Sequence, residues 1–168
     1  MELKSTLEAL IKIPEGWELC TITPYKAAYI WEHIKDKDVL FPDGSFRTYE
    51  ACLISLQRSV VYLHDRGFVR FDRIMDSLSA QMHGAIWRGS LSKYANEVRS
   101  VIASFFLLYP IRRVYCQLPV FCRSAKRALE ERVGFTLEGT MRSAVKYKGQ
   151  FYDEYLFSIL DTEVTYVW

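Results

Sequence analysis

Apolar residues recur along the chain with two different periods, and these divide it into strands and helices. Alternating apolar and polar residues are typical of half-buried strands, whereas apolar positions three and four apart are typical of helices that cover a core. The clearest helical stretch is 90–109, which carries one broad apolar face and is stopped by Pro110. The predicted elements, in chain order, are a strand at 17–22, helices at 23–34 and 48–64, strands at 68–74 and 79–87, a helix at 90–109, a strand at 112–120, a helix at 124–133, and strands at 135–147 and 151–160.

Cap and turn residues set several of these boundaries. Thr23 is a good N-cap residue, and Pro24 suits the first helical position that follows it. The Asp-Gly pair within residues 41–46 predicts a loop. Gly67 is expected to end the helix predicted over 48–64.

The order of the elements predicts a single mixed α/β domain that spans residues 1–168. A chain of this length suits one domain, and no internal repeat, linker or low-complexity segment divides it. Strand–helix–strand units in the middle imply a parallel strand pair, and the hairpins on either side imply antiparallel pairing. We therefore expect a mostly antiparallel central sheet with helices on both faces.

Composition narrows the classes of function. A net charge of +2 is too small to indicate binding to nucleic acid or to an anionic membrane. The longest apolar run, 101–111, falls far short of the roughly 20 residues that a membrane span needs. No N-terminal signal-peptide pattern is present, so we expect a reduced, cytoplasmic setting. The cysteines lack the C-x-x-C spacing of a zinc knuckle or a redox motif, and no metal is expected; they are Cys20, Cys52, Cys116 and Cys122.

The stretch "ERVGFTLEGTMR", residues 131–142, joins the end of a helix to a strand. With the residues around it, this pattern resembles the GNAT superfamily of acetyl-CoA-dependent N-acetyltransferases, most of all the branch of ribosomal-protein N-terminal acetyltransferases. The similarity covers about 40 residues, together with the order of the elements upstream. The residues that carry it are Ser124, Leu129, Glu130, Gly134, Phe135, Glu138, Gly139, Arg142, Gly149, Asp153 and the "FSIL" run at 157–160.

The resemblance implies a binding site for acetyl-CoA where two parallel strands, 78–87 and 112–119, splay apart. It places the pyrophosphate at the start of the next helix, in the segment "RGSLSKY", residues 88–94, where free N–H groups favour an anion. This segment departs from the family's loop because Leu91 replaces a small residue, and an ordinary loop with an N-cap at Ser90 is the alternative. The implied cofactor-binding residues are Ile86, Trp87, Arg88, Gly89, Ser90, Leu91, Ser92, Lys93 and Leu118, with Arg123 and Lys126 of the basic run "RSAKR", which is otherwise a solvated helix face.

Acetylation of an amine needs a base for the ammonium and an acid for the leaving thiolate. Members of the family often place a glutamate on the first splayed strand, but here that strand holds no carboxylate. His83 is its candidate base, unless this histidine only forms hydrogen bonds within the sheet. The family's acid, a tyrosine on the helix that ends in Gly-Phe, is also missing. Tyr115, Cys122 and Ser124 are the substitutes that the sequence offers.

Two functions of different classes follow from these observations. The first is an acetyl-CoA-dependent N-acetyltransferase that acts on a primary amine of a protein or small molecule. The second is a GNAT-fold protein that has lost catalysis and binds and modulates another protein. Small, aromatic-rich, divergent chains of this kind resemble some encoded by bacteriophages, for which the partner would be a host protein. Tyr166 and Trp168 in the tail serve either a dimer contact or the core, so a monomer and a homodimer both fit.

Overall fold

The structure, a computed structural model, describes residues 13–37 and 47–164. The loop predicted within 41–46 and the tail residues Tyr166 and Trp168 lie outside this described part. The strands are β1 (Glu18–Cys20), β2 (Val60–His64), β3 (Gly67–Met75), β4 (Ser79–Ile86), β5 (Arg113–Pro119), β6 (Thr136–Tyr147) and β7 (Gln150–Leu160). The helices are α2 (Pro24–Ile34), α3 (Tyr49–Gln57), α4 (Ala95–Leu108), α5 (Arg123–Ala128), the π-helix η2 (Leu129–Val133) and the 3-10 helix η3 (Asp161–Glu163).

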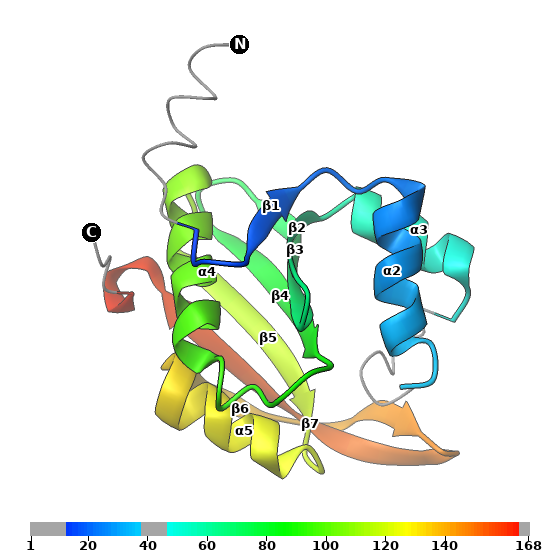
Figure 1. Cartoon of the computed structure of the whole chain (residues 1–168). Coiled ribbons are helices and arrows are strands. Elements are labelled where there is room, and N and C mark those ends of the chain that lie inside the picture. Colours follow the sequence, from blue (N-terminus) through cyan, green and yellow to red (C-terminus); the bar gives the residue numbers. More distant parts are fainter. Residues whose placement is uncertain (1–12, 38–46, 165–168) are drawn as a thin grey trace.

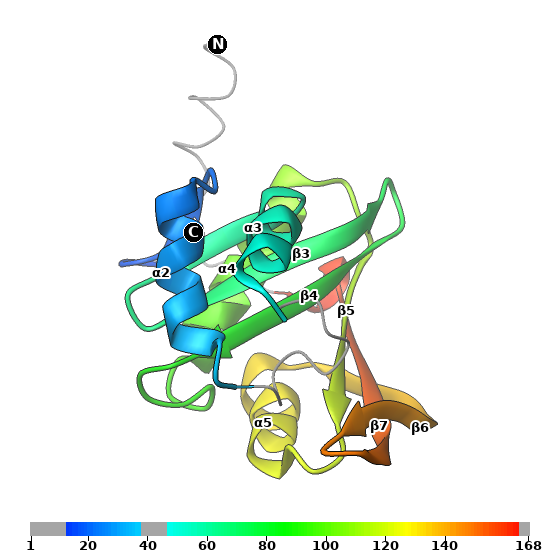
Figure 2. The ribbon, with the colours of Figure 1, turned by 90° about the vertical axis from the view of Figure 1, so that its right-hand side faces the viewer.

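The strands form one seven-stranded sheet in the order β1-β2-β3-β4-β5-β7-β6. Neighbouring strands pair antiparallel except β4 and β5, which pair parallel. Helices α2 and α3 cover one face, and α4 and α5 cover the other (Figures 1 and 2). The prediction of a mixed, mostly antiparallel sheet with helices on both faces is therefore confirmed.

Each helical layer has its own apolar core. Between α4 and the sheet lie buried side chains such as Ile102, Phe105 and Phe71, and the rings of the last two stack with centroids 3.8 Å apart. Between the α2–α3 pair and the sheet lies a smaller cluster that includes Ile30, Leu56 and Phe68. Burial of these clusters fixes the two helical layers against the sheet, and the splayed strands lie between the layers.

The helix predicted over 48–64 is wrong in its last part. Thr48 caps α3, and its hydroxyl accepts a hydrogen bond from the N–H of Ala51 at 3.2 Å, but the helix ends at Gln57. Residues 60–64 form strand β2 between β1 and β3, and Gly67 begins β3 instead of ending a helix. The apolar residues kept a helical spacing by chance, while the β-branched and aromatic run "VVYLH" fits a buried strand.

Two further helix boundaries differ from prediction. The helix predicted from residue 90 begins at Ala95, and residues 90–94 form a turn in which Lys93 and Tyr94 both donate their N–H groups to the Ser90 carbonyl. The helix predicted over 124–133 becomes a π-helix in its last turn, where the Gly134 N–H donates to the Leu129 carbonyl. Local spacing does not distinguish a turn or a π-helix from an α-helix.

The motif that resembles the GNAT family ties the last two strands to the sheet. The Ser158 hydroxyl of β7 hydrogen-bonds the Glu138 carboxylate of β6, and Arg113 of β5 lies 3.6 Å from the same carboxylate. The Asp153 carboxylate accepts a hydrogen bond from the Ser143 N–H at 2.9 Å, next to a register shift in β6. These residues therefore hold strands together and lie apart from the chemistry of the cavity described below.

Gly134 is expected to be far less tolerant of substitution than Gly139. Gly134 ends η2 with φ of 92°, and a Cβ there would collide with the guanidinium of Arg99, which donates to the Val133 carbonyl at 2.5 Å. Gly134→Ala should lower the free energy of unfolding by about 1–2 kcal/mol in urea titrations. A Cβ on Gly139 would meet no atom within 4 Å, so Gly139→Ala is the matched control. Equal stability of the two variants would contradict this account of the helix end.

Candidate active site

The parallel strands β4 and β5 separate after a short paired stretch. Ser79, Ala80 and Gln81 pair with Arg113, Val114 and Tyr115, and pairing ends there. From that point β4 continues beside β3 as far as Ile86, and β5 continues beside β7 as far as Pro119. The expected splay between strands 78–87 and 112–119 is therefore present.

The splay turns backbone groups of β4 toward open space. Peptide groups alternate sides along a strand, and the N–H of Trp87 donates to the Arg66 carbonyl at 2.8 Å, on the β3 side. The N–H and C=O groups of Met82 and Gly84 therefore face the side of β5, which has diverged by then. Backbone N–H groups in such a place can stabilise a developing negative charge.

A cavity of about 740 Å³ opens at the splay, a size that suits a small-molecule ligand. Because β4 and β5 diverge, its wall includes side chains from both faces of the sheet. The wall is built from residues 81–86 of β4, the loop 89–92, residues 116–119 of β5, the start of α5, and parts of β3, β6 and β7.

The loop between β4 and α4 forms one end of this cavity. Gly89 has φ of 94° and is followed by the turn in which the Ser90 carbonyl accepts from Lys93 and Tyr94. Within the described part of the chain, the N–H groups of residues 89–92 have no backbone acceptor. Such groups close to a helix N-terminus form a cradle for an anion.

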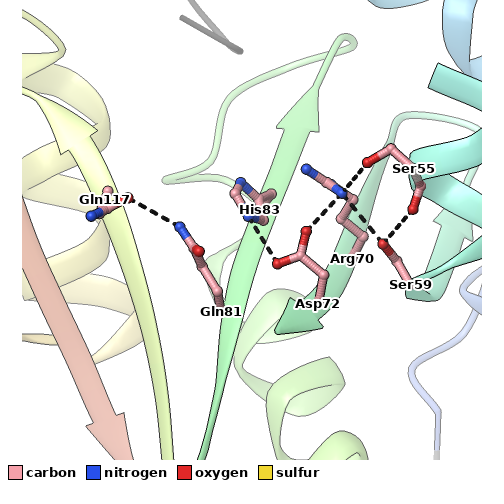
Figure 3. A network of polar contacts seen from close by, with 7 residues as sticks. All are labelled: Ser55, Ser59, Arg70, Asp72, Gln81, His83 and Gln117. Carbon is pink, nitrogen blue, oxygen red and sulfur yellow. Dashed lines mark hydrogen bonds and ion pairs between the residues drawn. The ribbon is translucent and has the colours of Figure 1, made fainter. Parts of the chain in front are cut away.

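A histidine on the cavity wall pairs with a carboxylate. His83 lies on its wall, and its Nε2 is 3.3 Å from Oδ1 of Asp72 on the neighbouring strand β3 (Figure 3). A neutral imidazole that donates from Nε2 keeps the lone pair on Nδ1, which then serves as a proton acceptor. The histidine thus forms a hydrogen bond within the sheet and still offers a basic nitrogen.

The carboxylate is ionised by its surroundings. Burial on its own would raise the pKa of Asp72, but the hydrogen bond from His83 and the charges of His83, Arg70 and Arg73 outweigh burial and lower it. Arg70, which is 1% exposed, lies 2.9 Å from Asp72 through Nη1 and Oδ2. At neutral pH Asp72 is therefore an anion between two partners.

A second polar contact lies where the strands begin to separate. The Gln81 amide donates to Oε1 of Gln117 across the gap at 3.1 Å (Figure 3). Among the described residues, the buried Oε1 of Gln81 has no hydrogen-bond partner. Both glutamines line the cavity, although this oxygen itself is buried.

The structure brings some of the expected site residues together and leaves others apart. The cavity wall includes His83, Cys122, Ser124, Ile86, Gly89, Ser90, Leu91, Ser92 and Leu118. Outside that wall lie Tyr115, Trp87, Arg88, Lys93, Arg123 and Lys126.

Contacts elsewhere explain the position of two of the excluded side chains. Trp87 stacks on His33 of α2 with ring centroids 4.5 Å apart and donates from Nε1 to the Asp65 carbonyl. Lys126 pairs with Glu130 at 2.6 Å, and both side chains are partly buried.

Sequence analysis missed Asp72, Arg70, Gln81 and Gln117. The one signal for Asp72 was its place in a predicted hairpin with the strand of His83. The pairing of that hairpin could not be deduced, because a register shift between Asp72 and Met75 displaces one strand against the other. Arg73 lies within this shift and has a positive φ of 47°, which the sequence does not predict.

Comparisons with known proteins identify the fold. No protein-family model matches the chain, and no curated protein matches it in sequence. Among solved structures, a GNAT-family acetyltransferase from Bacillus anthracis is 17% identical with a TM-score of 0.70, over 91% of this chain and 99% of that one. Spermidine N-acetyltransferase from Vibrio cholerae, solved with CoA and spermine, is 16% identical with a TM-score of 0.71, over 90% and 99%.

A third structure belongs to the branch that the sequence motifs resemble. It is the acetyltransferase from Salmonella typhimurium that modifies the N-terminal serine of a 50S ribosomal subunit protein, at 16% identity and a TM-score of 0.72, over 89% of this chain and 98% of that one. Such low identities show the fold and not the activity. The chain has the fold of the GNAT acetyltransferases, and its cavity lies where the two parallel strands splay apart.

Proposed function

We propose that the protein is an acetyl-CoA-dependent N-acetyltransferase that acts on a primary amine of a protein or small molecule. The observation that carries the proposal is one cavity at the splay whose wall includes both the loop 89–92 and His83, which pairs with Asp72. A thioester held with its phosphates at the loop would extend along the splay toward the histidine. The CoA bound to the Vibrio cholerae enzyme supports this choice of co-substrate.

The residues of the cavity divide the proposed reaction between them. Nδ1 of His83 takes a proton from the acceptor ammonium, directly or through water, and the neutral amine attacks the thioester carbonyl. The N–H of Met82 or Gly84 stabilises the oxyanion that forms.

The leaving thiolate needs a proton when the C–S bond breaks. Cys122 and Ser124 both line the cavity, whereas Tyr115 lies outside it. Burial raises the pKa of the Cys122 thiol, so at neutral pH that group is in the protonated form that a general acid needs. We favour Cys122 as the acid.

The proposed activity is tested by incubating the protein with acetyl-CoA and a panel of amines. The panel includes peptides with different N-terminal residues, lysine peptides and polyamines, and mass spectrometry detects an acetyl group on any of them. Transfer to at least one amine, with release of free CoA thiol, is the expected result. If acetyl-CoA binds but none of the amines is acetylated, catalysis by this cavity is contradicted.

A second function rests on a single observation. Leu91, in the loop that would hold the phosphates, lines the cavity where the family carries a small residue. A bulky side chain there would narrow the path of a pyrophosphate, which fits a protein that keeps the fold and binds another protein instead. In a chain encoded by a bacteriophage, that partner would be a host protein. Failure to bind acetyl-CoA would favour this second function.

A further inference from the structure

The candidate base is connected to a helix by a continuous chain of polar contacts. The Asp72 carboxylate bridges two partners, because Oδ1 lies 3.3 Å from Nε2 of His83 and Oδ2 lies 2.9 Å from Nη1 of Arg70. The guanidinium and the imidazole are therefore held at opposite oxygens of one carboxylate (Figure 3).

Two serine hydroxyls at the end of α3 contact the same nitrogen of this arginine. Nη1 of Arg70 donates to the hydroxyls of Ser55 at 2.7 Å and Ser59 at 3.3 Å. The Ser59 hydroxyl in turn donates to the Ser55 carbonyl at 2.8 Å. A cation that is 1% exposed, and whose Nη1 contacts both the carboxylate and two serine hydroxyls, has little freedom to move, so it holds the carboxylate in one orientation.

We infer that Asp72 and Arg70 are positioning residues that act through His83: Asp72 selects the tautomer with the proton on Nε2, and Arg70 limits how strongly the imidazole holds a proton. The second role follows from charge. A carboxylate beside an imidazole favours the protonated ring, and a cation at the same carboxylate opposes it. The inference rests on the proposed function only in taking His83 as the base.

Other charged groups line the same cavity as this histidine. Arg73 follows Asp72 on β3 and is exposed, while Glu154 of β7 and Lys146 of β6 lie on the wall of the same cavity. Arg73 is the matched control for Arg70, because it also carries a positive charge near Asp72 but is exposed to solvent, which screens its charge.

The test is nuclear magnetic resonance of the histidine side-chain nitrogens in the free protein, which needs no acceptor or acetyl-CoA. The chain has three histidines, and the spectrum of His83→Gln assigns the signals of His83. In the unmodified protein we expect the Nε2–H tautomer. Asp72→Asn should move the midpoint of His83 protonation down by about one pH unit, and Arg70→Gln should move it up by about one unit. Arg70→Lys should restore most of the original midpoint, and Arg73→Gln should change it little.

The opposite signs separate this account from simple structural damage, which would not displace the midpoint in opposite directions. Shifts of the same sign, no shift in either variant, or an equal effect of Arg73→Gln would overturn the inference. If Arg70→Gln does not fold, the Ser55→Ala, Ser59→Ala double variant keeps the arginine and removes its hydroxyl partners. The Nε2–H of His83 should then exchange faster with water, and an unchanged exchange rate would overturn the inference too.

These results are independent of whether the protein transfers acetyl groups. If the variants show the predicted midpoints but the protein acetylates no amine, the positioning network is supported and the proposed function is contradicted. If the protein acetylates amines but the protonation of His83 does not respond to substitution of Asp72 or Arg70, the proposed function is supported and the positioning network is contradicted.

Discussion

Replacing His83 with Gln is expected to lower the turnover number for acetyl transfer by about two to four powers of ten, the usual contribution of a general base. Gln is similar in size and still offers a hydrogen-bond donor to Asp72, but it accepts no proton at neutral pH. The affinity for acetyl-CoA should be nearly unchanged, because the loop 89–92 follows the end of β4 at Ile86 and does not include His83. Release of CoA thiol, followed with an amine that the panel has shown to accept the acetyl group, measures the effect.

His33→Gln is the matched control for this experiment. That histidine stacks on Trp87, and its Nδ1 bonds the Tyr29 carbonyl within α2. It lies outside the cavity wall, so turnover should stay near that of the unmodified protein. Unmodified turnover in His83→Gln would show that His83 serves only to hold the sheet together, and the base would have to be sought elsewhere.

A negative charge at Ser92 is expected to weaken acetyl-CoA binding by more than tenfold. The Ser92 side chain is exposed on the cavity wall, in the loop whose N–H groups have no backbone acceptor among the described residues and are proposed to hold the phosphates. A carboxylate there competes for the same N–H groups and repels a pyrophosphate, so the loss should exceed the roughly 0.3–1 kcal/mol of helix-end electrostatics alone. Calorimetric titration of Ser92→Asp and Ser92→Asn with acetyl-CoA measures it.

The two Ser92 variants differ in charge and hardly in shape, so their difference isolates electrostatics. Ser92→Asn should bind acetyl-CoA nearly as well as the unmodified protein. Gly89 is unsuitable for this test, because its φ is 94° and an added Cβ would lie 2.6 Å from the Tyr94 ring. Equal affinities of Ser92→Asp and Ser92→Asn would place the phosphates away from this loop.

The sequence was informative where local chemistry determines structure. Thr23 does cap a helix, and a helical segment does end at Gly134, which lies in the left-handed region. The register of the strands could not be predicted from the sequence, because the partner of a strand residue depends on bulges that leave little trace in the sequence. Periodicity also failed over 60–64, where a short apolar run fitted a helix and a strand equally well.

The candidate site also combines a residue that the sequence identified with residues that it did not. His83 could be selected from the sequence because it was the one candidate base on its predicted strand, and it does lie on the cavity wall. Asp72, its partner, comes from the neighbouring strand and needed the exact pairing of β3 with β4. Arg70 looked like an ordinary polar residue in an alternating strand, yet it is buried against the end of α3. Contacts between elements that are distant in the chain decide such roles.

Calorimetric titration of the unmodified protein with acetyl-CoA tests the central claim most directly, because the co-substrate must occupy the cavity at the splay before any residue in it can act. We expect binding of one molecule per chain, with a dissociation constant in the micromolar range that is common for enzyme substrates, on the order of 1–1000 μM. Desulfo-CoA, which lacks the thioester but keeps the phosphates, should compete for the same site. Absence of binding at millimolar acetyl-CoA, with the protein folded, would contradict the acetyltransferase account and leave the fold as a scaffold for binding another protein.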